Sequence, residues 1–175
     1  MTNQQLTGVE RKFADDEILV SKTDIDSRLT YANDVFIQVS GYSEDELLGQ
    51  PHNLIRHPDM PKCIFKLLWD TIQSGNEIFA YVINRAKNGD HYWVYAHVTP
   101  WFDAGGKIAG YHSSRRSAEE GLLKQTIIPL YGSLRAEEAG QNDSSRAMAA
   151  ALRVLDETVE ARGFRDYEEF IHRLT

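Results

Sequence analysis

Cysteine and long apolar runs are the scarcest features of this 175-residue sequence. The one cysteine, Cys63, cannot form a disulfide within the chain, and such scarcity is typical of a reducing compartment, so we expect a cytoplasmic protein. The longest fully apolar run, residues 78–83, falls far short of the ~20 residues that cross a bilayer. The N-terminus also lacks the apolar core of a signal peptide. We therefore expect no membrane span.

Basic residues are also in the minority, with 19 Lys and Arg against 26 Asp and Glu and a formal charge of −7. A surface for nucleic acid or an anionic membrane needs a basic excess, so the sequence predicts neither partner. It contains no Gly-x-Ser-x-Gly motif, no phosphate-binding loop and no kinase signature. We therefore expect a binding module and not an enzyme.

The hydrophobic content of 42% is sufficient for one packed domain with some additional helix. Residues 1–17 are polar, and we expect them to form an N-terminal cap. Residues 18–21 and 28–32 predict two short strands joined by a turn. Asn33 follows the second strand and is the residue type that begins a helix, since its side chain can accept from a free backbone N–H.

The next segments predict a helix and a three-stranded meander. The helix is expected to begin around Asp59, with Pro61 in its first turn, and to end at Gly75. Beyond it the apolar period changes from helical to alternating, and Asn88-Gly89 is a strong hairpin signal. The three predicted strands cover residues 78–85, 91–101 and 107–116.

Residues 119–175 return to a helical pattern that Pro129 is expected to kink. The sequence therefore predicts an α+β domain over 18–118: a five-stranded antiparallel sheet with helices on one face, followed by a C-terminal helical tail. A cleft between such a sheet and its helices is a common small-molecule site. The apolar stripes of the tail predict either a contact with a partner or a second copy, or two helices that pack on each other.

Three strings carry a resemblance to PAS domains: Tyr31-Ala32-Asn33-Asp34, Gly41-Tyr42-Ser43 and the stretch 88–93. The longer string over residues 49–61 resembles, more specifically, the PAS domain of the aerotaxis receptor (Aer) family. That family binds FAD non-covalently and reports its redox state to a chemotaxis kinase pathway. The resemblance implies a redox or oxygen sensor of the PAS fold, with flavin-site residues Asn33, Arg56, His57, Asp59, Trp69 and Asn84.

The chemistry of some of these residues agrees with a flavin. The amide of Asn84 can bind the pyrimidine edge, Trp69 can form an aromatic wall, and the planar fork of Arg56 suits a pyrophosphate. A purely structural interpretation stands beside it. Arg56, His57 and Asp59 can form a capping and salt-bridge cluster at the start of the helix, and Trp69 can belong to the core.

Two further interpretations stay open. None of the six histidines has the spacing of a metal site on one helix, but a haem-b gas sensor needs only one axial ligand, for which His52 or His57 is best placed. A cofactor-free PAS interaction module is the other. Whichever ligand the chain binds, we expect it to pass its signal to a signalling protein such as a chemoreceptor or histidine kinase, or to act as a homodimer.

Cys63 raises the question of a light sensor, because light-sensing flavin PAS domains use a cysteine. In those domains it lies in a Gly-x-Asn-Cys-Arg string, and the equivalent position here is His52. We therefore predict no cysteinyl-flavin photoadduct and expect Cys63 to be a buried or half-buried thiol.

Overall fold

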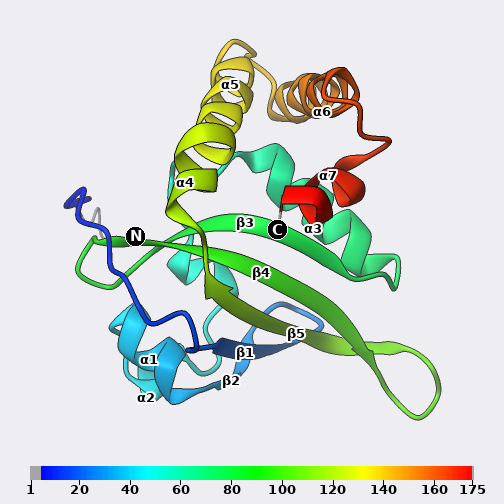
Figure 1. The fold of residues 1–175 in the computed structure, drawn as a ribbon. Coiled ribbons are helices and arrows are strands. Elements are labelled where there is room, and N and C mark those ends of the chain that lie inside the picture. Colours follow the sequence, from blue (N-terminus) through cyan, green and yellow to red (C-terminus); the bar gives the residue numbers. More distant parts are fainter. Residues whose placement is uncertain (1–4, 175) are drawn as a thin grey trace. The chain divides into compact units, whose positions relative to one another are not determined.

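The computed structural model describes residues 5–174 (Figure 1). Contacts divide the chain into two compact units. The sheet unit extends up to His57 and continues over Ile72–Ala118. The helical unit contains Pro58–Thr71 together with the chain from Glu119 onward. The sequence pattern does not indicate that Pro58–Thr71 belongs to the helical unit.

The sheet unit is built on five antiparallel strands in the order β2-β1-β5-β4-β3, which confirms the predicted PAS-type sheet (Figure 1). The central long hairpin of β4 and β5 pairs on one side with β3 and on the other with β1. The strands are β1 (Leu19–Asp24), β2 (Leu29–Ala32), β3 (Ile78–Arg85), β4 (His91–Phe102) and β5 (Ile108–Ser117).

Short helices follow β2 within this unit. They are α1 (Asp34–Ser40), α2 (Glu44–Leu47) and the 3₁₀ helix η1 (His52–Ile55). Asn33 caps α1 as predicted, because its Oδ1 accepts from Phe36 N–H at 3.0 Å. The same oxygen accepts from Val20 N–H, and Nδ2 donates to the Ile18 carbonyl, so this one amide fastens α1 to β1.

One face of the sheet carries most of the buried side chains, and we call it the inner face. Directly paired residues of neighbouring strands point to the same side of a sheet, so the register defines this face. Its central row consists of Ala80, Ala96 and Arg115, and the Phe36 ring of α1 lies 5.1 Å from the Arg115 guanidinium. Its members are Leu19, Ser21, Thr23, Ile78, Ala80, Val82, Asn84, Tyr92, Val94, Ala96, Val98, Tyr111, Ser113 and Arg115.

The helical unit contains most of α3 and all helices after the sheet. They are α3 (Lys62–Gln73), α4 (Glu120–Leu122), the π-helix η2 (Leu123–Ile127), α5 (Ile128–Ala139), α6 (Ser144–Ala161) and α7 (Tyr167–Leu174). The irregularity expected at Pro129 takes the form of the π turn, in which Ile128 N–H donates to the Leu123 carbonyl. Proline lacks an N–H and displaces the carbonyl four residues earlier, so the preceding turn widens. No helix within residues 5–174 is long and apolar enough to cross a membrane.

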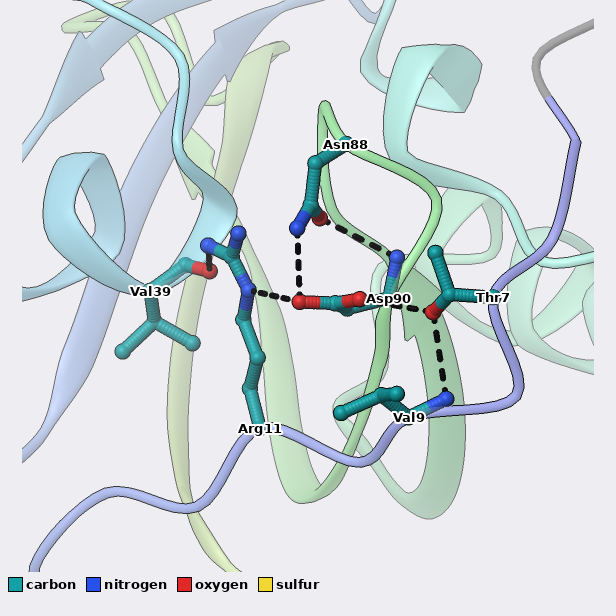
Figure 2. A network of polar contacts seen from close by, with 6 residues as sticks. All are labelled: Thr7, Val9, Arg11, Val39, Asn88 and Asp90. Carbon is teal, nitrogen blue, oxygen red and sulfur yellow. Dashed lines mark hydrogen bonds and ion pairs between the residues drawn. The ribbon is translucent and has the colours of Figure 1, made fainter.

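The N-terminal segment is tied to the start of β4 by a network around Asp90 (Figure 2). The Asp90 carboxylate accepts from Thr7 Oγ1 at 2.6 Å, Arg11 Nε at 3.0 Å and Asn88 Nδ2 at 2.7 Å. Arg11 also donates to the Val39 carbonyl, which joins the segment to the end of α1. The hydrogen bonds from Thr7, Asn88 and Arg11 lower the pKa of Asp90 to about 2.

Candidate ligand-binding site

The inner face holds a concentration of buried polar atoms with no hydrogen-bond partner among residues 5–174. An unpaired buried donor or acceptor costs ~1–3 kcal/mol, and native proteins contain few of them. Five share this one face, at positions on β1, β3, β4 and β5. They are Thr23 Oγ1, Asn84 Nδ2, Tyr92 OH, Ser113 Oγ and Arg115 Nη1. Such a set is suited to a polar ligand.

Arg115 is the most unusual member, because it is a cation with only 3% of its surface exposed. Its Nη2 donates to Ser21 Oγ and to His52 Nε2, each at 2.7 Å. Within residues 5–174 no carboxylate pairs with it. Burial lowers the pKa of Arg115 to about 10, which still leaves it charged at neutral pH. A buried cation without a counter-charge is costly unless a ligand supplies acceptor atoms.

His52 acts as the neutral acceptor of this cluster. Burial and the neighbouring Arg115 charge lower its pKa to about 3, so the imidazole is uncharged at neutral pH. Its ring lies parallel to that of Phe36, with centroids 6.4 Å apart. Because Nε2 accepts from Arg115, its lone pair is already engaged and is not free for a haem iron.

The centre of the inner face has small side chains. Ala80 pairs directly with Ala96, and Ala96 pairs with Arg115, so two methyl groups stand in the row beside the guanidinium. Both alanines are at most 2% exposed. Small side chains next to a polar cluster are compatible with a planar ring that has polar edges.

Three of the residues implied by the resemblance lie together at the edge of β3. The backbones of Arg56 and Asn84 form an antiparallel bridge. His57 follows directly, is 4% exposed, and packs edge-on against the ring of His91 with centroids 5.8 Å apart. Asn84 is 4% exposed and has the unpartnered Nδ2. The structure therefore places Arg56, His57 and Asn84 in one cluster.

The other three residues lie elsewhere. All the hydrogen bonds of Asn33 described above go to backbone atoms, so its part in any site is to hold α1 in place. Asp59 belongs to the helical unit and forms an ion pair with Arg135 at 2.6 Å. Trp69 is a half-buried residue of α3, also in the helical unit.

Arg115, Ser21 and Ser113 are polar site residues that sequence reasoning missed. The alternation of β5 would place every second residue inward, but a shift of one residue exchanges Arg115 for Arg116. The two arginines are adjacent and have serines on either side, so the local pattern does not identify the inward one. Among the described residues, no group of three or more histidine, cysteine or acidic side chains is arranged to hold a metal ion.

Known proteins show clear similarity to this chain. The family model described as PAS fold matches residues 29–115. The aerotaxis receptor of Escherichia coli (strain K12) is 50% identical over 123 residues, which cover 70% of this chain and 24% of that protein. The nitrogen fixation regulatory protein of Klebsiella pneumoniae is 30% identical over 99 residues, or 57% of this chain and 20% of that protein. The chain thus spans a quarter or less of these relatives.

Solved structures agree on the fold. The light-state structure of the blue-light photoreceptor Aureochrome1 LOV has a TM-score of 0.57 and 23% identity, covering 63% of this chain and 89% of that one. A light-oxygen-voltage domain studied with a flavin analogue has a TM-score of 0.55 and 19% identity, covering 71% and 87%. At these identities the similarity concerns the fold alone.

Proposed function

The chain belongs to the PAS family through residues 29–115, and from this premise we propose that it is a sensor that binds FAD non-covalently. The observation that carries the proposal is the set of five unpartnered polar atoms on the inner face, with the uncompensated Arg115 among them. An isoalloxazine has carbonyl acceptors, an amide-type N–H and a flat apolar body. Its edge therefore matches the donors and acceptors that the protein leaves unpaired.

Each residue has a distinct part in holding such a group. The Asn84 amide binds the pyrimidine edge, and Arg115 donates to an acceptor that gains negative charge on reduction. Arg56 is assigned to the pyrophosphate, because its guanidinium can bind phosphate in a bidentate manner. Trp69 is proposed as the aromatic wall on the strength of the sequence resemblance.

FAD, when bound, supplies reversible reduction. The charge of Arg115 favours the reduced ligand, because a cation in a site of low polarity stabilises added negative charge. His52 holds that guanidinium in place from the opposite side while staying neutral itself. The pair of Arg115 and His52 can thus respond to electron gain in the ligand while His52 itself stays neutral at neutral pH.

A haem sensor has less support than a flavin sensor. His52 Nε2 is engaged by Arg115, and the buried ring of His57 packs against His91. A cofactor-free module is also disfavoured, because it would retain the cost of the unpartnered polar atoms.

Output is proposed to pass from a cytoplasmic sensor to a signalling protein such as a chemoreceptor or histidine kinase, or to a second copy, through residues 119–175. The similarity to the aerotaxis receptor and to the nitrogen fixation regulatory protein supports a role in signalling and not in catalysis. Hydrogen exchange on the oxidised and reduced protein tests this proposal. We expect changed protection in α5, and unchanged protection after Ala118 would contradict it.

Titration of flavin-free protein with FAD tests the cofactor proposal. We expect saturable binding with one FAD per chain, seen as quenching of flavin fluorescence. Haem, added in a parallel titration, should give no stoichiometric complex. Saturable haem binding without FAD binding would contradict the proposal.

A further inference from the structure

The N-terminus of α3 is capped by a carboxylate from a helix far along the chain. Glu138 of α5 accepts from Cys63 N–H with Oε1 at 2.7 Å and from Lys62 N–H with Oε2 at 3.1 Å. The first N–H groups of a helix have no partner inside it and carry partial positive charge, so a carboxylate there is favourable. Asp59, the residue expected to begin this helix, instead pairs with Arg135 at 2.6 Å.

Arg135 and Glu138 act from the same side of α5, because residues three positions apart share one face of a helix. We call the contacts of these two residues with Asp59 and the α3 N-terminus the α5 clamp. The side chains of Arg135 and Asp59 are each about half exposed, and exposed ion pairs of this kind contribute little to the free energy of unfolding. Glu138 is half-buried and accepts from two backbone N–H groups with both carboxylate oxygens, so Glu138 carries most of the clamp.

The chain from the clamp back to the ligand site is short. Arg56 is bridged through its backbone to Asn84, whose Nδ2 has no hydrogen-bond partner in the described part of the chain. His57 precedes a proline, which restricts its backbone to extended conformations. Asp59 comes immediately after that proline. Arg56, the backbone partner of Asn84, is therefore only three residues before Asp59 of the clamp. A change in the hydrogen bonding of Asn84 can reach the clamp through this short segment.

We propose that the α5 clamp passes the ligand state of the Asn84–Arg56 region to the C-terminal helices, with Glu138 as the positioning residue. The inference rests on the proposed function, since it names the route by which the flavin site regulates the tail. A switch of this kind needs contacts that differ between two states, and its coupling is reciprocal.

Cys63 provides a probe at the clamp itself, because it is the only cysteine of the chain. Its side chain is fully buried, and burial together with the Glu138 carboxylate raises the pKa of the thiol to about 12. Alkylation requires the thiolate, so the labelling rate is low while the clamp is closed and rises when it opens.

The experiment measures the rate of iodoacetamide labelling of Cys63 in the full chain, with and without saturating FAD. In the wild-type protein the two rates should differ by about fivefold or more. In Glu138→Ala they should agree within about twofold, while the flavin spectrum persists. Glu138→Gln keeps one acceptor oxygen and should restore part of the difference. Glu137→Ala, the same truncation one position earlier, should behave like the wild type.

Two results would contradict the proposed role of the clamp. One is a ratio of labelling rates with and without FAD in Glu138→Ala that equals the wild-type ratio. The other is equal labelling rates with and without FAD in a wild-type protein that binds FAD. If Glu138→Ala does not fold, Glu138→Gln replaces it: the ratio of labelling rates with and without FAD should fall below that of the wild type, and a wild-type ratio would again contradict the inference. If the wild type binds no FAD, the proposed cofactor fails by itself. Asn84→Ala should then still change the labelling rate of flavin-free protein, and an unchanged rate would overturn the clamp.

Discussion

Nη2 of Arg115 lies 2.7 Å from Nε2 of His52, and the two side chains form a buried pair in which only the arginine is charged. Ser21 Oγ accepts from the same Nη2, while Nη1 has no hydrogen-bond partner among the residues that the structure describes. Neutral acceptors compensate a buried guanidinium less than a carboxylate does. The pair therefore orients a charge whose remaining donor is available to a ligand.

Replacement of the Arg115 charge should lower the affinity for FAD without lowering the free energy of unfolding. Arg115→Met should lower FAD affinity by about tenfold to a hundredfold, because the loss of a charged hydrogen bond costs ~1.5–3 kcal/mol. The free energy of unfolding of the flavin-free protein should be unchanged or higher, since an unpaired buried charge has been removed. Calorimetric titration and chemical denaturation measure the two quantities.

Arg116→Met is the matched control, because Arg116 is the exposed neighbour on the same strand. It should leave FAD affinity unchanged. If Arg115→Met binds FAD as well as the wild type, the buried arginine belongs to the scaffold and not to the ligand site.

Asn84→Ala should also weaken FAD binding by about tenfold or more, because the amide no longer serves the ligand. Arg56→Ala should act in the same direction through the loss of a phosphate contact. Circular dichroism should show an intact fold in both variants. Asn142→Ala, in an exposed position between α5 and α6, is the control for amide truncation. Unchanged FAD affinity in both site variants would limit these residues to a structural part.

The pH dependence of stability should carry the signature of His52. Its folded pKa of about 3 lies below the ordinary value of 6.5, so the unfolded chain binds a proton first as the pH falls. The contribution of His52 to the free energy of unfolding is complete above pH 6.5. It is lost as the pH falls from 6.5 to 3, at up to ~1.4 kcal/mol per pH unit. His52→Asn should flatten the unfolding profile there while keeping an acceptor for Arg115.

Asp90→Asn serves as a contrast, because the pKa of Asp90 is lowered from 3.8 to about 2. Asp90→Asn should lower the free energy of unfolding above pH 3.8, and it should change the slope of the unfolding profile only between about pH 3.8 and 2. Identical unfolding profiles of the wild type and His52→Asn between pH 6.5 and about 4.5 would contradict the buried, neutral state of His52.

The sheet could be predicted from sequence because its signals are local. Alternating apolar residues and the Asn88-Gly89 turn define β3 and β4, and Asn33 supplies both the cap of α1 and its link to β1. The approximate position of the Arg56–Asn84 cluster came from a resemblance in sequence and not from periodicity. These features depend on residues close together in the chain or on a shared family string.

Features that depend on long-range pairing could not be predicted. Glu138 caps a helix that begins 76 residues earlier, and nothing near Lys62 indicates a partner at that distance. The inward position of Arg115 depends on a strand register that a slip of one residue reverses. The π turn before Pro129 was also not predicted, since the sequence indicated a kink and a proline can instead widen its preceding turn.

Blue light should not produce a thiol adduct in the flavin-loaded protein. The sequence resemblance implies that His52 stands where light-sensing PAS domains have their cysteine, and the backbone N–H of Cys63 donates to Glu138 at the start of α3. Bleaching and dark recovery should therefore be the same in the wild type and in Cys63→Ala. A recovery that disappears in Cys63→Ala would show that the thiol reacts with the flavin.

The visible absorbance spectrum of the purified full chain, followed by identification of any released chromophore, tests the central claim most directly. The account predicts two broad flavin bands that bleach on reduction, and release of FAD on denaturation. A sharp Soret band would contradict it, as would a colourless protein that takes up no FAD on reconstitution.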